Sequence, residues 1–231
     1  RPRLCPACQH SRGRLCHTGR LAIASEHSRR LRLAVAIGAA CGGADQLFDL
    51  PALPKRVGVL GLGAIGLEMG LALARLGVEV IGADVASTVA GIADPQIGER
   101  AIACCGKEMT LWLGGEASVS PAVDGVLMRS GEREAKVDLL LAALGRRPNV
   151  ASLNLEAAGV ALDAHGLPKF DPATLQIGNL PIFIAGDANG DRPLMHEAAD
   201  EGVIAGYNAA RAEATRFGRK AAIGIAFSNP D

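Results

Sequence analysis

The glycines at the centre of the chain have the spacing of a phosphate-binding turn. Residues 61–66 read Gly-Leu-Gly-Ala-Ile-Gly, which is a G-x-G-x-x-G pattern. In such a turn the first glycine allows a tight bend, the second lets a pyrophosphate approach the backbone, and the third allows close helix packing. The anion lies on free N–H groups at the positive end of the helix. We therefore expect a dinucleotide to contact Gly61, Gly63, Ala64, Ile65 and Gly66.

The segments around this turn supply the elements that it needs. Residues 56–61 indicate a short buried strand, residues 64–76 an apolar helix ending near Gly77, and residues 78–81 a second strand. A strand, a glycine turn, a helix and another strand in this order make the pattern specific for a dinucleotide. The alternative is a glycine-rich turn that binds no ligand.

The ribose of a dinucleotide is usually bound by an acid at the end of the second strand, about 20 residues further on. Gly82 occupies the expected place, and Asp84 follows slightly late. We assign Asp84 to the ribose. Because no Arg lies nearby to bind a 2′-phosphate, the sequence favours NAD, with NADP as the alternative.

The region after Asp84 predicts one more helix and several short strands. Asp94 suits a helix N-cap and Pro95 suits the first helical position, so a helix is expected to about residue 105. Short strands separated by turns follow and predict an antiparallel β-meander. They are expected at residues 109–113, 117–120, 125–129 and 136–144.

A second candidate site lies near the carboxyl end of the sequence. Residues 181–187 read as an apolar strand that ends in Gly186 and Asp187, and a helix is expected from Asp191 to about Arg211. Open α/β sheets bind ligands at the carboxyl ends of their strands, so Asp187 is a candidate ligand contact. The alternative is that Asp187 only caps a turn.

Composition and charge narrow the class of protein. The chain has 231 residues, of which 49% are hydrophobic and 21% charged, as in globular α/β proteins. Aromatic residues make up only 3%, which argues against a base-stacking surface for nucleic acid. No apolar run approaches the ~18 residues of a membrane span, and no leader is recognisable, so we expect a cytoplasmic protein that binds no membrane.

The first 32 residues differ from the rest. They carry eight Arg and one acid, giving a charge of +7 against −7 for the remainder. Cys5 and Cys8 form a C-x-x-C pair, which with nearby His and Cys could bind zinc, although a second pair is missing. A poorly ordered basic arm is the favoured interpretation, and a zinc-holding arm that contacts nucleic acid is the minor alternative. Cys104 and Cys105 are expected to be reduced and buried.

Three segments together resemble the flavin-dependent pyridine nucleotide–disulfide oxidoreductases, most closely those of the dihydrolipoamide dehydrogenase type. They are VGVLGLGAIGLEMGLALARLG at 57–77, DLLLAALGRRPN at 138–149, and TLQIGNLPIFIAGDANGDRPLMHEAADEG at 174–202. Residues 33–39 also resemble the family's strand that ends in Ala-Thr-Gly. The resemblance therefore covers about residues 30–231.

The resemblance implies roles for individual residues. Glu68 would lie near the nicotinamide and the flavin, and Gly145 would line the NAD cleft. Asp187, after Gly186, would bind the flavin ribityl chain. Leu194, Met195 and His196 would lie under the flavin pyrimidine edge, where a helix N-terminus stabilises negative charge on the reduced ring. The implied cofactors are NAD and FAD.

The resemblance also implies an architecture, which is α/β with a Rossmann-like NAD-binding domain inserted in a partial FAD-binding domain, in three layers with an antiparallel β-meander. We expect a basic arm at 1–32, a partial FAD-binding domain at 33–51 and 148–218, an NAD-binding domain at 52–147, and the start of a dimerisation domain at 219–231. The family forms homodimers through that last domain.

Two features of the family are missing from these residues. Its FAD-binding glycine fingerprint is not found, and no two cysteines have the C-x4-C spacing of its redox disulfide. The expected function is therefore that of a truncated flavin-dependent NAD(P)H oxidoreductase without dithiol chemistry. The alternative is a non-catalytic NAD(H)-binding module.

Overall fold

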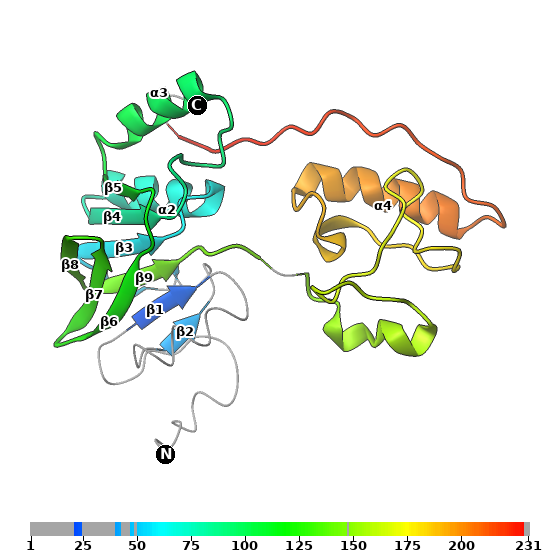
Figure 1. Ribbon diagram of the computed structural model, residues 1–231, viewed down its shortest axis with the longest axis horizontal. Helices are drawn as coiled ribbons and strands as arrows, with labels where there is room; N and C mark the ends of the chain where they lie inside the picture. Colours follow the sequence, from blue (N-terminus) through cyan, green and yellow to red (C-terminus); the bar gives the residue numbers. More distant parts are fainter. Residues whose placement is uncertain (1–20, 25–39, 43–46, 49, 147, 229–231) are drawn as a thin grey trace, which may run out of the picture. The chain divides into compact units, whose positions relative to one another are not determined.

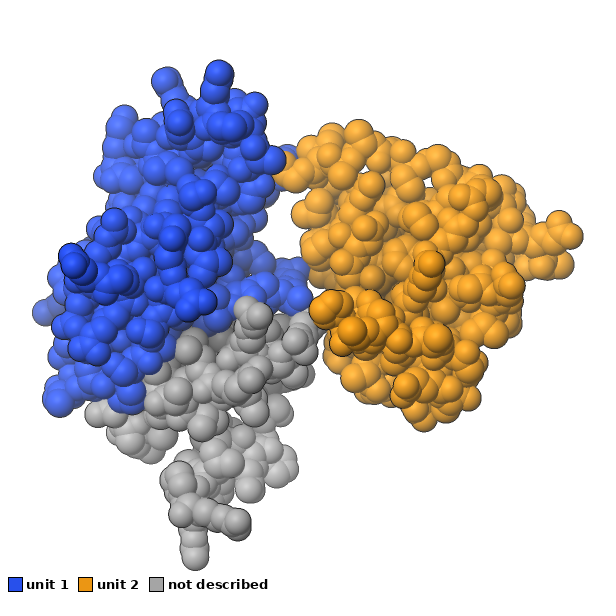
Figure 2. All heavy atoms as spheres, in the orientation of Figure 1, with its two compact units in different colours: residues 1–146, 225–231 blue, residues 147–224 orange. Residues whose placement is uncertain are grey.

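The computed structural model describes residues 21–24, 40–42, 47–48, 50–146 and 148–228 (Figure 1). The chain forms two compact units, residues 1–146 with 225–231 and residues 147–224 (Figure 2). The C-x-x-C pair and the strand expected at 33–39 lie outside the described residues. The predicted division into domains stays a prediction.

The first unit is built on a six-stranded sheet with the order β2-β1-β9-β3-β4-β5. Every neighbouring pair that the structure describes in this sheet is parallel. Its strands are β1 (Leu21–Ala24), β2 (Ala40–Gly42), β3 (Arg56–Leu60), β4 (Glu79–Asp84), β5 (Thr110–Leu113) and β9 (Leu139–Ala142). Parallel pairing brings the carboxyl ends of these strands to one edge of the sheet.

Two helices connect strands of this sheet. Helix α2 (Ala64–Arg75) joins β3 to β4, and helix α3 (Pro95–Cys105) joins β4 to β5. Both helices were predicted and are confirmed. The predicted N-cap of α3 is also confirmed, because the Asp94 carboxylate accepts hydrogen bonds from the backbone N–H groups of Gln96 and Ile97.

Alternating side chains of the strands define three layers. Val57 and Val59 of β3 pack in one core with Leu67 and Leu71 of α2. Leu60, on the opposite face of the sheet, packs in a second core that also contains residues of a three-stranded antiparallel meander. The meander consists of β6 (Ser118–Ala122), β7 (Gly125–Ser130) and β8 (Arg133–Val137). The predicted α/β class with a meander is confirmed.

The strand predicted at residues 136–144 is wrong as a single element. The structure ends β8 at Val137, and β9 begins in the other sheet at Leu139. Asp138 lies at the corner, where its carboxylate accepts hydrogen bonds from the backbone N–H groups of Lys55 and Arg56 at 3.0 and 2.9 Å. This polar residue interrupts the apolar run, so Gly145 follows the central sheet and not the meander.

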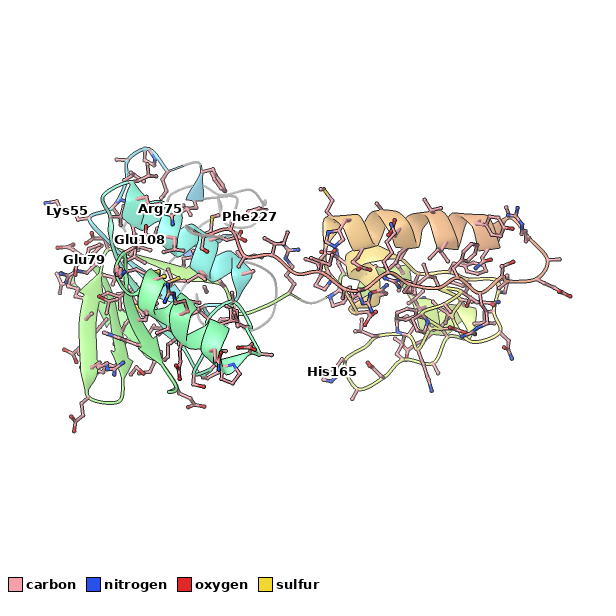
Figure 3. The ribbon with its side chains drawn as sticks, turned by 90° about the horizontal axis from the view of Figure 1, so that it is seen from above. Lys55, Arg75, Glu79, Glu108, His165 and Phe227 are labelled. Carbon is pink, nitrogen blue, oxygen red and sulfur yellow. The ribbon has the colours of Figure 1, made fainter. Side chains whose placement is uncertain are left out.

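The second unit contains little regular structure. It has three short 3-10 helices, η3 (Ala151–Leu153), η4 (Leu155–Ala158) and η5 (Gly186–Asn189), and one α-helix, α4 (Met195–Ala209), in the residues described. Its core is formed by Val150, Val160, Ile177 and Ile184. The turn at His165 (Figure 3) is closed by Asp163, whose carboxylate accepts the His165 N–H.

Two predictions for this unit are wrong. Residues 181–187 do not form a strand, because only the segment at residues 175–177 pairs with them in the described structure and it does so through isolated contacts. Helix α4 begins at Met195 and not at Asp191. Pro193 disfavours helical geometry at Arg192, which explains the late start.

Within the described part of the chain, no helix is long and apolar enough to cross a membrane. The same residues contain no cluster of three or more His, Cys, Asp or Glu side chains that could bind a metal ion.

Candidate functional site

The glycine turn lies at the edge of the sheet where three strands end. The Gly61 N–H donates a hydrogen bond to the Ala83 carbonyl oxygen at 2.8 Å, and the Ala143 N–H donates to the Leu60 carbonyl oxygen at 2.7 Å. The turn is thus held from both sides by residues at the carboxyl ends of β4 and β9. This edge is where open α/β sheets bind their ligands.

The three glycines of the turn are required for different reasons. A Cβ on Gly61 would lie 2.4 Å from the Ala143 carbonyl oxygen, and a Cβ on Gly66 would lie 1.9 Å from the Gly61 carbonyl oxygen. Backbone packing therefore excludes any side chain at both positions. At Gly63 no atom lies within 4 Å of the same Cβ, and its φ of −61° suits any residue. The fold does not require a glycine at Gly63, and its open side is available to a ligand.

Helix α2 begins directly after Gly63 and has no side-chain cap. Its first backbone N–H to bond within the helix is that of Leu67, which donates to the Gly63 carbonyl oxygen at 3.0 Å. The N–H groups of Ala64, Ile65 and Gly66 precede that bond, and such groups at a helix start have no partner within the helix. Together with the helix dipole they can bind an anion such as a pyrophosphate.

Asp84 is the last residue of β4, which runs three residues further than the predicted strand. Its Oδ2 accepts a hydrogen bond from the Leu62 N–H in the glycine turn at 2.5 Å, and its Oδ1 accepts one from the Ala86 N–H at 2.9 Å. Asp84 is late only relative to the predicted strand, which ended at residue 81, and the structure places it at the end of β4. Gly82 points into the core, where a Cβ would lie 2.6 Å from a Leu62 methyl carbon.

Gly145 and Glu68, the other two residues assigned to the nicotinamide side, lie on different elements of the first unit. Gly145 follows β9 with a φ of +90° and an open side, so it lies near the edge where the turn is. Glu68 lies more than one turn into α2, and its Oε1 accepts a hydrogen bond from the Phe227 N–H at 3.0 Å. Phe227 is labelled beside α2 in Figure 3.

The second group of predicted site residues lies in the other unit. Gly186 is buried with a φ of +67°, and a Cβ on it would lie 3.1 Å from the Ala198 Cβ of α4. The turn η5 therefore packs closely on this helix. Asp187, on the turn, is exposed. Leu194 is the N-cap residue of α4, and its side chain makes no capping hydrogen bond. Met195 and His196 are the first two residues of the helix, and both are exposed.

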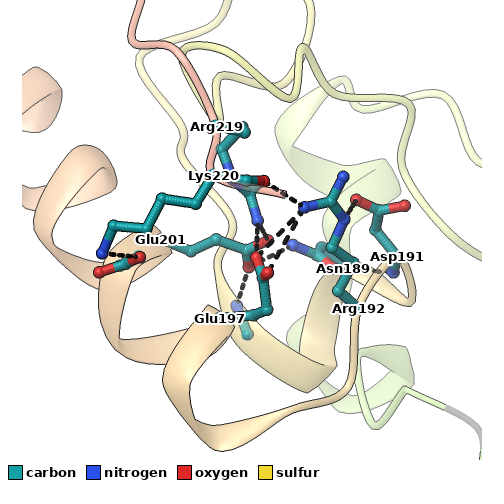
Figure 4. A network of polar contacts seen from close by, with 9 residues as sticks. Asn189, Asp191, Arg192, Glu197, Glu201, Arg219 and Lys220 are labelled. Atoms are coloured by element: carbon teal, nitrogen blue, oxygen red, sulfur yellow. Dashed lines mark hydrogen bonds and ion pairs between the residues drawn. The ribbon is translucent and has the colours of Figure 1, made fainter. Parts of the chain in front are cut away.

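A network of buried charges beside η5 was missed by sequence analysis (Figure 4). Glu197 and Glu201, four residues apart on α4, are 4% and 0% exposed. Arg219 lies 2.5 Å from a Glu197 oxygen and 2.8 Å from a Glu201 oxygen. Two acids four residues apart on one helix face were visible in the sequence. Their partner Arg219 was not, because it lies 18 or more residues away in a segment without helix or strand.

The charges in this network stabilise one another. Hydrogen bonding to Arg219, helped by Arg192, holds the pKa of Glu197 below its usual value. Burial alone would lower the pKa of Arg219, but its hydrogen bond to Glu197 and its ion pair with Glu201 raise it above the usual value. Glu197 and Arg219 are therefore both charged at neutral pH.

The described residues thus form an α/β fold with a glycine turn that is open beside Gly63. A family model described as pyridine nucleotide-disulphide oxidoreductase matches residues 33–202. The chain is 34% identical over 165 residues to a dihydrolipoyl dehydrogenase of Cupriavidus necator. The matched region covers 68% of this chain and 34% of that relative. It is also 35% identical over 158 residues to a mercuric reductase of Acidithiobacillus ferrooxidans. This match covers 68% of this chain and 28% of the mercuric reductase.

Solved structures agree with this result. LpdA from Mycobacterium tuberculosis matches with a TM-score of 0.69 and 29% identity over 80% of this chain and 40% of LpdA. The flavoprotein disulfide reductase RclA from Escherichia coli matches with a TM-score of 0.66 and 27% identity over 74% and 39%. The chain belongs to the pyridine nucleotide–disulfide oxidoreductase family. It spans about a third of the length of the curated relatives that it matches.

Proposed function

We propose that the chain binds NAD(H) at the turn of residues 61–66 and contributes to an FAD site with Asp187 and the start of α4. The chain would thus form part of a flavin-dependent nicotinamide oxidoreductase of the dihydrolipoamide dehydrogenase type. Residues 52–147 would form the NAD-binding domain, and residues 33–51 with 148–218 would belong to the FAD-binding domain. The activity of the whole protein is part of this proposal, because the chain matches only part of each relative.

The observation that carries the nicotinamide half is the open side of Gly63. Packing explains why Gly61 and Gly66 are glycines, whereas no packing contact requires a glycine at position 63, where a pyrophosphate could approach the backbone. The bare N-terminus of α2 supplies donors for the pyrophosphate, and Asp84 supplies a carboxylate for the ribose hydroxyls. A carboxylate there disfavours the extra phosphate of NADP by charge repulsion, so the proposal prefers NAD.

The flavin half rests on the geometry of η5 and α4. Asp187 presents an exposed carboxylate, an acceptor that a hydroxylated ribityl chain can donate to. The uncapped N-terminus of α4 presents N–H groups and a positive dipole end, which favour a negatively charged reduced flavin. A bound flavin would exchange hydride with the nicotinamide, and the protein would bind and orient both cofactors.

The test is a titration of the purified chain with NADH, followed by fluorescence, with an absorbance scan for bound flavin on the same sample. Gly63→Val fills the open side of the turn, so NADH affinity should fall by at least about tenfold while the fold survives. Gly206→Val places the same side chain on α4, where the space is equally open, and should leave NADH affinity unchanged.

Three outcomes separate the candidate functions. NADH binding with flavin binding supports the proposed oxidoreductase. NADH binding without any flavin binding favours the non-catalytic NAD(H)-binding module. Equal NADH affinity in wild type and Gly63→Val would show that the cofactor does not lie at this turn.

A further inference from the structure

Glu201 is the charged side chain that the fold buries most completely among the described residues, with 0% exposure. Removing a carboxylate from water is costly unless hydrogen bonds and an opposite charge compensate it. Apolar residues fill helix positions of this kind at much lower cost. The contacts of the Glu201 carboxylate therefore indicate which role requires a buried charge at this position.

One oxygen of Glu201 holds both ends of the turn η5. Oε2 accepts a hydrogen bond from the Gly186 N–H at 2.6 Å and another from the Asn189 side-chain amide at 2.7 Å. Gly186 is the first residue of η5 and Asn189 is the last. Asp187 lies between these two residues in the sequence, so the same carboxylate contacts the turn on either side of it, at the Gly186 backbone and at the Asn189 side chain.

The other oxygen of Glu201 pairs with Arg219 at 2.8 Å. Arg219 lies in a segment without helix or strand, and buried contacts fix that segment to the rest of the unit. The Asn208 side chain, itself fully buried, donates to the Thr174 and Thr215 carbonyl oxygens and accepts the Thr215 N–H. These contacts bring the positive charge to Glu201 from 18 residues further along the chain.

We infer that Glu201 and Arg219 are positioning residues for the turn that carries Asp187. Glu201 sets the backbone of residues 186–189, and Arg219 supplies the charge that allows the carboxylate to be buried there. This inference rests on the proposed function, because it assigns the purpose of the turn to flavin binding. It goes further by naming Glu201, which contacts the turn, and Arg219, which pairs with Glu201.

The structure offers a matched control. Glu197 lies one turn earlier on the same helix, is also buried, and also pairs with Arg219, at 2.5 Å. Its carboxylate accepts hydrogen bonds from the Arg192 and Arg219 guanidinium groups. A change at Glu197 therefore removes the same charge from the same network without removing the acceptor that holds η5.

The experiment uses the full chain and the variants Glu201→Met and Glu197→Met, which keep similar volume. FAD affinity is measured by quenching of flavin fluorescence, NADH affinity by its own fluorescence, and thermal stability without either cofactor. Glu201→Met should lower FAD affinity by at least tenfold more than Glu197→Met does, and NADH affinity should be unchanged in both. Glu201→Gln keeps one acceptor and should recover part of the loss.

Each outcome decides between the explanations. Equal loss of FAD affinity in both Met variants would overturn the inference, because the network would then act only through stability. If Glu201→Met does not fold, the comparison of Glu201→Gln with Glu197→Gln decides in the same way, with weaker FAD binding expected for Glu201→Gln. A wild-type chain that binds NADH but no FAD would overturn the flavin half of the proposed function and this inference with it. Loss of FAD affinity confined to the Glu201 variants supports the inference.

Discussion

The carboxylate of Asp84 accepts a hydrogen bond from the Leu62 N–H at 2.5 Å, which ties the end of β4 to the glycine turn. The acid proposed to select the ribose thus also holds the backbone proposed to receive the pyrophosphate. Its second oxygen, bonded to the Ala86 N–H, holds the start of the following loop. Each carboxylate oxygen has two lone pairs, so a ribose hydroxyl can still donate to it.

This geometry makes a prediction about cofactor choice. Wild type should bind NADH more tightly than NADPH, because the Asp84 charge repels a 2′-phosphate. Asp84→Asn removes the charge but keeps an acceptor for Leu62, so the preference should shift towards equal affinity by at least about tenfold, or about 1.4 kcal/mol. Titrations of wild type and Asp84→Asn with NADH and with NADPH measure the ratio of the two affinities in each protein. A wild type that prefers NADPH would contradict the assignment.

Alanine at two glycines of the turn should reduce the stability of the fold by very different amounts. Gly66→Ala places a methyl group 1.9 Å from the Gly61 carbonyl oxygen, and neither backbone can move freely. The cost should reach about 3 kcal/mol or more, because overpacking against rigid neighbours is strongly destabilising. Gly63→Ala meets no atom within 4 Å and should cost less than about 1 kcal/mol, chiefly through a weaker helix cap.

Urea denaturation of both variants compares these values directly. The comparison is internally controlled, since the two residues lie in the same turn and receive the same methyl group. Similar losses of stability in both variants would contradict the distinction between a packing glycine and a ligand glycine.

Local patterns were sufficient to predict the glycine turn and the elements around it, but not the buried contacts beside Asp187. The turn, α2 and the N-cap of α3 depend on residues close together in sequence, so spacing alone locates them. The break between β8 and β9 depends on the Asp138 carboxylate reaching backbone groups more than 80 residues away. The pairing of Glu201 with Arg219 likewise depends on tertiary structure, which a single sequence does not display.

The adjacent cysteines at the end of α3 should differ in reactivity. Cys105 is buried, and burial followed by the neighbouring Cys104 and Glu108 raises the pKa of its thiol. The thiolate is the reactive form, so less of Cys105 is available near neutral pH. Cys104 is half-buried and should be alkylated at least about tenfold faster in the folded protein.

The variants Cys104→Ser and Cys105→Ser separate the two thiols. Iodoacetamide labelling followed by peptide mapping should find slow labelling in Cys104→Ser, where only Cys105 remains at this position. Labelling should be faster in Cys105→Ser, where only Cys104 remains. In urea the two variants should react alike. Equal rates in the folded state would show that burial does not protect Cys105.

The ion pairs made by carboxylates of α4 predict how the second unit responds to acid. The pKa of Glu197 is lowered chiefly by its hydrogen bond to Arg219, and that of Asp200 by its hydrogen bond to Lys220. A carboxyl whose pKa is lower in the folded state binds protons more readily after unfolding. Its contribution to stability is therefore complete above the ordinary pKa of 4.5 for Glu and 3.8 for Asp, and it is lost as pH falls towards the folded value.

Thermal melting of the chain should thus change little between about pH 7 and 5 and should fall steadily below about pH 4.5. Glu197→Gln cannot lose a proton, so its melting temperature should be lower at neutral pH and should depend less on pH in the acid range. Glu213→Gln, at an exposed carboxylate of the same unit, is the control and should follow the wild-type curve. A Glu197→Gln curve parallel to wild type throughout the acid range would mean that the ion pairs with Arg219 and Arg192 add nothing to the stability of the folded unit.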